Sequence, residues 1–135
     1  MGQLDGKVTI LTGAGTGIGK GMARAFAREG SHLILASRNK ANLDETAAEI
    51  ANSGTKTIVV PTDVTSESEV KALFARTMQE FGRVDILINN SGTFDGGPFE
   101  ELSLETWQKV VAVNLTGPFL CAREAMGIMK KQGGG

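Results

Sequence analysis

Tyrosine is absent from this 135-residue sequence, and cysteine and histidine each occur once. The single cysteine, Cys121, excludes an internal disulfide and fits a reducing compartment, so we expect a cytoplasmic protein. Without a cluster of Cys and His we expect no metal site. No apolar run approaches the roughly 18 residues of a membrane span, and the polar start, residues 1–6, does not resemble a signal peptide. A net charge of −1 without charged runs argues against nucleic-acid and membrane partners.

What is present is an ordinary globular composition, with 41% hydrophobic and 21% charged residues. The length predicts one domain, residues 1–135. Apolar runs alternate with segments of helical periodicity. We predict strands at 7–11, 32–36, 57–60 (stopped by Pro61) and 85–88, and helices at 18–29, 40–52, 66–81 and 103–131, the last bent near the proline at 116–118. The strands are apolar at nearly every position, which predicts an α/β fold with a doubly wound parallel sheet.

The most informative segment is the glycine-rich stretch 12–19, which joins a predicted strand to a predicted helix. A helix that begins after such a turn presents backbone N–H groups and a positive end to a phosphate. The pattern G-x-G-x-x-G fits in no register, and the P-loop pattern fails because its spacing differs and no Ser or Thr follows Lys20. What fits is T-G-x-x-x-G-x-G, starting at Thr12. Taken alone, the stretch also fits a tight strand–helix connection.

This pattern resembles the cofactor loop of the short-chain dehydrogenase/reductase family. Three further segments strengthen the resemblance: Asp63-Val64 after the third strand, the N-N-S-G run at 89–92 where the family has N-N-A-G, and Asn114 in a helix. The four motifs occur in the family's order and extend along the whole chain. The resemblance implies a Rossmann-type fold that ends after the fourth strand and its following helix. In such a sheet, ligands bind beyond the carboxyl ends of the strands, where these motifs converge.

The resemblance also implies a set of residues for a dinucleotide cofactor. They are Gly13, Gly15, Thr16, Gly17, Ile18, Gly19, Ser37, Arg38, Asp63, Val64, Asn90 and Gly92. In the family, the aspartate at the position of Asp63 contacts the adenine amino group. On their own, Asp63 also fits a helix start and Asn90 a turn.

The end of the second strand bears on the choice between NAD(H) and NADP(H). An NAD site normally places an acidic residue there, against the ribose 2′-OH. This sequence has Ser37-Arg38 instead, and an arginine can bind a 2′-phosphate with two hydrogen bonds. The alternative is that Arg38 is a solvated helix-start residue, and Thr16 adds no support. We expect NADP(H) in preference to NAD(H).

The family's reaction needs a Tyr-x-x-x-Lys pair and a serine, and this chain has no tyrosine. Asn114 is the one catalytic residue that the resemblance implies here. In the family this asparagine holds a water molecule of the proton relay. The chain therefore resembles the cofactor-binding half of an NADP(H)-dependent carbonyl/alcohol oxidoreductase, and we expect the 135 residues alone to be inactive. The parent's partner would be a small carbonyl or alcohol substrate. The alternatives are a non-catalytic nucleotide-binding module and an interaction fragment.

Several other residues have structural interpretations. We expect Cys121 to be buried as a small apolar residue, His32 to be structural, and Phe99 and Trp107 to pack their helix against the sheet. The last helix is rich in apolar residues, among them Leu115 and Phe119. In the family this helix lies in a subunit interface, so we expect a homo-oligomer formed through it.

Overall fold

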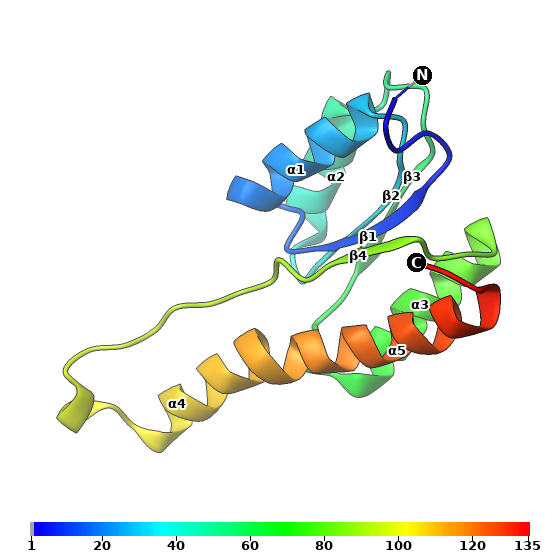
Figure 1. Ribbon diagram of the computed structural model, residues 1–135. Helices are drawn as coiled ribbons and strands as arrows, with labels where there is room; N and C mark the ends of the chain where they lie inside the picture. The colour runs from blue at the N-terminus through cyan, green and yellow to red at the C-terminus, as the bar shows by residue number, and fades with distance from the viewer. Residues whose placement is uncertain (1) are drawn as a thin grey trace.

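The computed structural model describes residues 2–135 and contains one four-stranded sheet in the order β3-β2-β1-β4 (Figure 1). All neighbouring strands are parallel. The strands are β1 (Val8–Thr12), β2 (His32–Ser37), β3 (Thr57–Pro61) and β4 (Ile86–Ile88). The helical elements are α1 (Gly17–Arg28), α2 (Lys40–Glu49), α3 (Glu67–Phe81), η1 (Phe99–Glu101), α4 (Leu104–Val111), η2 (Ala112–Thr116) and α5 (Gly117–Gln132).

Helices cover both faces of the sheet: α1 and α2 lie on one face, and α3 and α5 on the other (Figure 1). Two hydrophobic clusters form as a result. Leu11, Leu33 and Leu35 belong to the cluster on the α1–α2 side, whereas Ile10 and Ile34 belong to the cluster on the α3–α5 side. The alternation of side chains along a strand explains why nearly every strand position is apolar. The predicted doubly wound α/β fold is confirmed.

The register brings the carboxyl ends of the strands together. Thr12, the last residue of β1, pairs with Ala36 of β2, and Ala36 pairs with Val60 of β3. Ile88 at the end of β4 pairs with Leu11. The loops that follow the four strands therefore leave the sheet at one edge, which is where the predicted motifs occur.

Most predicted boundaries lie within one residue of the observed ones, and two of the differences have a physical explanation. Pro61 was expected to stop the third strand, but it is the strand's last residue. Because β3 is an edge strand, a proline at its end removes no hydrogen bond from the ladder. The second predicted helix was expected to reach residue 52, but α2 ends at Glu49 and is followed by a turn that includes Gly54 at φ +82°.

The long C-terminal helix contains a π-helical segment, η2, between α4 and α5. At its end the Gly117 N–H donates to the Ala112 carbonyl, five residues earlier. Pro118 follows in the first turn of α5, where its missing N–H costs little. The disturbance that the proline predicts near 116–118 thus takes the form of a wider helical turn.

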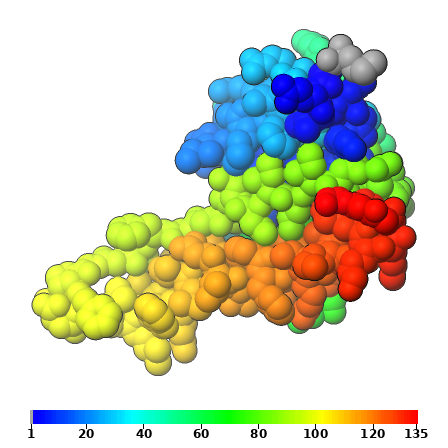
Figure 2. Space-filling view, in the orientation of Figure 1, coloured from blue at the N-terminus to red at the C-terminus, as the bar shows by residue number. Residues whose placement is uncertain are grey.

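Residues 92–116, which we call the arm, extend away from the sheet (Figures 1 and 2). They comprise the loop after β4, η1, α4 and η2, and none of these helical elements has a buried residue. Phe99 is 85% exposed and Trp107 is 54% exposed. The prediction that these two residues pack against the sheet is wrong, because η1, which contains Phe99, and α4, which contains Trp107, lie beyond the edge of the sheet. No helix within residues 2–135 has the length and apolar content that crossing a bilayer requires.

Candidate functional site

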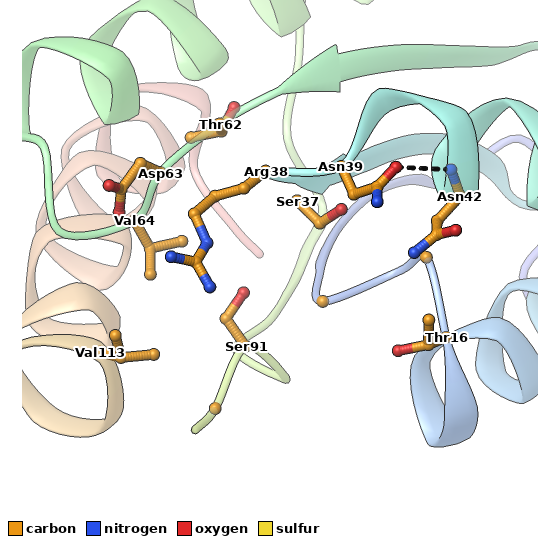
Figure 3. A pocket seen from close by; sticks show the side chains of 13 residues that line it. Thr16, Ser37, Arg38, Asn39, Asn42, Thr62, Asp63, Val64, Ser91 and Val113 are labelled. Carbon is orange, nitrogen blue, oxygen red and sulfur yellow. Dashed lines mark hydrogen bonds between the residues drawn. The ribbon is translucent and has the colours of Figure 1, made fainter. Parts of the chain in front are cut away.

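A cavity of about 250 Å³ opens at the carboxyl ends of the strands (Figure 3). It is lined by the last residue of β2, by the loops after β1, β2, β3 and β4, and by one residue each of α2 and η2. The lining residues are Gly13, Gly15, Thr16, Ser37, Arg38, Asn39, Asn42, Thr62, Asp63, Val64, Ser91, Gly92 and Val113. Asp63 is the only carboxylate among them. The other polar groups of the cavity are hydroxyl, amide and guanidinium groups and the backbone of the loops.

The glycine loop is shaped by contacts that exclude side chains. Gly13 has φ +63°, and a Cβ there would lie 2.9 Å from the side-chain nitrogen of Asn90. A Cβ on Gly19 would collide with the carbonyl oxygen of Gly13. These two glycines allow the first turn of α1 to approach the end of β1 closely. Gly17, at φ +52°, begins α1 and is exposed, so its N-terminal N–H groups are open to a ligand.

A buried threonine joins this loop to the loop after β4. The Thr12 hydroxyl accepts hydrogen bonds from the N–H groups of Asn90 and Ser91, both at 3.0 Å, and donates to the Ile88 carbonyl at 3.3 Å. The Asn90 amide in turn donates to the Gly13 carbonyl at 3.1 Å. The four bonds fix the two loops side by side. The sequence pattern did not point to this role of Thr12.

The loop after β2 supplies the cationic side of the cavity. Arg38 extends its guanidinium group toward Asp63, Val64 and Ser91 (Figure 3). Asn39 is the N-cap of α2, and its side-chain oxygen accepts a 3.1 Å hydrogen bond from the Asn42 N–H.

Asp63 is held in place by its own loop. Its Oδ1 atom accepts hydrogen bonds from the Thr65 hydroxyl at 2.7 Å and from the Thr65 N–H at 2.9 Å. These bonds, with a smaller contribution from the charge of Arg38, hold the pKa of the Asp63 carboxyl below its usual range. Asp63 is therefore an anion that can accept a hydrogen bond from a ligand amino group.

Asn114 of η2 connects the two ends of the arm. Its side-chain oxygen accepts a 2.8 Å hydrogen bond from the Thr93 N–H, and its side-chain nitrogen donates to the Thr93 carbonyl at 2.8 Å. The amide is thus paired with the backbone of the loop after β4, and Asn114 does not line the cavity.

The cavity brings together most of the residues predicted for a cofactor. Those that line it are Gly13, Gly15, Thr16, Ser37, Arg38, Asp63, Val64 and Gly92. Gly17, Ile18, Gly19 and Asn90 do not line it: Ile18 is 77% exposed on the first turn of α1, and Gly19 and Asn90 support the loop. Sequence reasoning missed Asn39, Asn42, Thr62, Ser91 and Val113, which also line the cavity. Ser91 lies within the N-N-S-G motif at 89–92. A polar residue on a helix, such as Asn42, gives no comparable signal in the sequence.

The other singled-out residues have structural roles. Cys121 is fully buried, and burial raises the pKa of its thiol to about 11, so it is not a reactive nucleophile. His32 stacks on Phe81 with ring centroids 5.6 Å apart, and its Nδ1 accepts a hydrogen bond from the Lys56 N–H at 3.0 Å. Within residues 2–135, no group of three His, Cys, Asp or Glu side chains could hold a metal ion.

The fold and the cavity together define a nucleotide-binding α/β protein, with a glycine loop, a helix N-terminus and polar strand ends at one edge. Comparison with known proteins specifies the class. The model of the short chain dehydrogenase family matches residues 7–135. The chain belongs to this family, whose members are oxidoreductases that bind NAD(P) cofactors.

Individual relatives agree with this assignment. The short chain dehydrogenase/reductase astE of Aspergillus oryzae is 40% identical over 135 residues, which cover 98% of this chain and 52% of the relative. An uncharacterized oxidoreductase of Thermotoga maritima is 41% identical over 133 residues, with 98% and 52% covered. The chain spans about half the length of the curated relatives it matches.

Solved structures show the same relation. A short-chain type dehydrogenase/reductase of Mycobacterium marinum has a TM-score of 0.93 at 36% identity, with 96% of this chain and 53% of that chain covered. A candidate short-chain dehydrogenase/reductase of Burkholderia xenovorans has a TM-score of 0.96 at 36% identity, with 100% and 55% covered.

Proposed function

We propose that residues 1–135 form the cofactor-binding half of an NADP(H)-dependent carbonyl/alcohol oxidoreductase. The observation that carries the cofactor preference is made at the end of β2. Ser37 and Arg38 line the cavity there, and no carboxylate occupies the end of this strand. A carboxylate there would accept from a ribose 2′-OH and repel a 2′-phosphate. Arg38 instead offers several N–H donors in a planar group, which suits a phosphate.

The remaining parts of the cavity suit the other groups of the dinucleotide. The glycine loop and the N-terminus of α1 would hold the pyrophosphate through backbone N–H groups. Asp63, as an anion, would accept a hydrogen bond from the adenine amino group, and Val64 offers an apolar surface beside it. The nicotinamide end would extend toward Gly92 and Val113, the two residues of the arm that line the cavity. When bound, the cofactor supplies the hydride, and this chain's residues position it.

The geometry refines the role proposed for Asn114 in the proton relay. Both atoms of its side-chain amide are engaged with Thr93. The Gly117 N–H donates to Ala112, and Pro118 has no N–H, so neither gives an intrahelical hydrogen bond to the carbonyls of Val113 and Asn114. We infer that a relay water would be held by a backbone carbonyl of this π-helical segment, with Asn114 as the positioning residue.

Residues 1–135 contain no tyrosine, so they lack the acid–base group of the family's reaction. We expect this chain to bind the cofactor's adenosine part without oxidising NADPH in the presence of small carbonyl compounds. NADPH turnover by the purified chain, followed at 340 nm with an aldehyde and ketone panel, would show that it is complete by itself. A non-catalytic nucleotide-binding module is the second candidate, because the cavity is formed within these residues.

We further propose a cytoplasmic location and a homo-oligomer. The location rests on the one cysteine, Cys121, being buried and unpaired. The oligomer rests on the exposed apolar side chains of the arm and of α5, among them Trp107, Leu115 and Phe119.

The cofactor preference is tested by isothermal titration of the chain with 2′,5′-ADP and with 5′-AMP, which lacks only the 2′-phosphate. We expect 2′,5′-ADP to bind more tightly, and Arg38→Ala to weaken it by about 10- to 100-fold while 5′-AMP changes by about twofold or less. Arg28→Ala is the matched control, because Arg28 is an exposed arginine on α1 outside the cavity. Equal affinities of the wild type for the two nucleotides would contradict the NADP(H) preference.

A further inference from the structure

Four polar side chains that line the cavity have no partners in the protein. Within residues 2–135, none of these side chains makes a hydrogen bond or an ion pair to another residue, although all four line the cavity. They are Thr16, Ser37, Arg38 and Asn42. The neighbouring Asn39 differs, because its side chain caps α2. Ser37 and Asn42 are half-buried, and Thr16 and Arg38 are exposed, so their polar groups are free to bind a polar ligand in the cavity.

Asn42 faces this site because of how α2 is docked. One turn further along the helix, the buried Thr46 hydroxyl donates to the Ala14 carbonyl of the glycine loop at 3.0 Å. Residues four apart lie on the same face of a helix, so Asn42 is turned toward the same loop. A Cβ on Gly15 would lie 2.9 Å from the Asn42 Cβ and 3.3 Å from the Ser37 hydroxyl oxygen. Asn42 and Ser37 thus meet at Gly15. Figure 3 shows the side chains of Asn42 and Ser37 on the same side of the cavity.

The backbone of Asn42 has a different task from its side chain. The N–H donates to Asn39 in the helix cap, and the carbonyl accepts from the Thr46 hydroxyl at 3.1 Å. A substitution at Asn42 therefore leaves the cap and the helix–loop contact in place. The free amide of Asn42 sits in the first turn of α2, where the helix end favours an anion.

We propose that Asn42 is a specificity-determining residue that donates its side-chain amide to the 2′-phosphate of the cofactor. The inference rests on the proposed NADP(H) function and goes beyond it in assigning part of the selectivity to α2. The pyrophosphate is expected at the start of α1, whereas Asn42 lies on the element that follows Ser37 and Arg38. Its amide would complete a phosphate site with the Ser37 hydroxyl and with the Arg38 guanidinium, which would turn from Asp63 toward the phosphate.

The test compares 2′,5′-ADP and 5′-AMP by isothermal titration on the wild type and three variants of the full 135-residue chain. Asn42→Ala removes the amide, and Asn42→Asp keeps its shape but places a negative charge against the phosphate. Ala41→Asp is the matched control: Ala41 is exposed in the same helical turn and does not line the cavity. Circular dichroism and the melting temperature of each variant establish that it is folded.

We expect Asn42→Ala to weaken 2′,5′-ADP by about tenfold and Asn42→Asp by about 100-fold, with 5′-AMP changed by about twofold or less. The Ala41→Asp variant should keep at least half of the wild-type preference. Retention of the preference in both Asn42 variants would overturn the inference, and so would an equal loss of 5′-AMP affinity or an equal loss in Ala41→Asp. A wild type that binds both nucleotides equally well would instead contradict the proposed NADP(H) cofactor. If only Arg38→Ala selectively weakens 2′,5′-ADP, the NADP(H) proposal holds and the role of Asn42 is overturned.

Discussion

The sheet with its four covering helices and the arm, residues 92–116, differ in what they leave without partners. In the sheet region, apolar side chains are buried in two clusters, and the unpartnered groups are polar ones around a cavity. In the arm the reverse holds. Phe94 is 94% exposed and Leu104 is 68% exposed, whereas the polar Asn114 has both amide atoms paired.

This difference indicates what kind of partner each region can bind. Polar groups held by a packed scaffold suit a small polar ligand, because the scaffold fixes them before the ligand arrives. Exposed apolar groups on a segment that touches little else suit a macromolecular surface that removes them from water. The first region fits a nucleotide, and the second fits a subunit interface.

A matched pair of phenylalanines tests the contrast with the largest effect on stability. Phe74 is 2% exposed in the cluster between α3 and the sheet, so Phe74→Ala should lower the free energy of unfolding by about 3–5 kcal/mol. Phe94→Ala should change it by about 0.5 kcal/mol or less, because the side chain is already in water. Urea unfolding measures both. Comparable losses would show that the arm packs on the sheet in solution.

A pair of threonines tests the contact between the two loops with an intermediate effect. Thr12→Val keeps the shape but leaves the N–H groups of Asn90 and Ser91 without their acceptor, so it should cost about 1–3 kcal/mol. The hydroxyl of Thr57, within the described residues, is buried without a partner, so Thr57→Val should be neutral or stabilising. Thr12→Val should also weaken 2′,5′-ADP. An unchanged affinity for 2′,5′-ADP would show that the contact between the two loops does not shape the nucleotide site.

Acid sensitivity is the third test and involves Asp85, which precedes β4. Burial raises the pKa of Asp85, but hydrogen bonds from Arg83 and from the Val8 N–H outweigh it and hold that pKa below its usual range. A lowered folded-state pKa stabilises the protein above the unfolded-state pKa of about 3.9, and this stabilisation is lost as the pH falls through the folded-state value. Asp85→Asn should therefore flatten the fall in stability below about pH 5.

The control for this test is Asp95→Asn in the arm. Asp95 is exposed, with a 4.0 Å ion pair to Lys109, so its replacement should leave the acid unfolding curve in place. Denaturant midpoints measured between pH 3 and pH 7 compare the two variants. The same flattening in both would mean that net charge, and not the contact with Val8, governs the response.

The smallest effect on the stability of a single chain is expected in the proposed interface. Leu115 and Phe119 are 67% and 56% exposed, so Leu115→Glu with Phe119→Glu should change monomer stability by about 1 kcal/mol or less. The same double variant should shift the chain toward monomer in analytical ultracentrifugation. Ala41→Glu with Ala51→Glu adds the same charge at exposed positions outside the arm and α5, and it should leave association unchanged.

The sheet region was predicted well from the sequence because its strands and its glycine loop follow short, recurring residue patterns. Strands such as 32–36 are apolar at nearly every position, and the glycine pattern after Thr12 reflects close backbone contacts that allow no side chain. The arm was predicted less well. An apolar stripe on a helix such as α4 shows that the helix packs against something, but it does not show what, and Trp107 was assigned to the sheet for that reason.

Within the site, the residues missed by the sequence are those that tertiary packing places there. Asn42 enters the cavity only because Thr46 fixes the rotation of α2 against the glycine loop. Thr12 joins two loops that are distant in the chain, which no local pattern reveals. Asn114 was selected by resemblance, and its pairing with Thr93 depends on how the arm leaves β4.

The central claim, that the carboxyl edge of the sheet is a nucleotide site and that the outer part of the arm, η1 and α4, is not part of it, is tested most directly by NMR. A ¹H–¹⁵N titration with 2′,5′-ADP should give saturable shifts in the glycine loop, in residues 37–42 and at Asp63, with no shifts in α4. Shifts that are absent, or that centre on the arm, would contradict the claim.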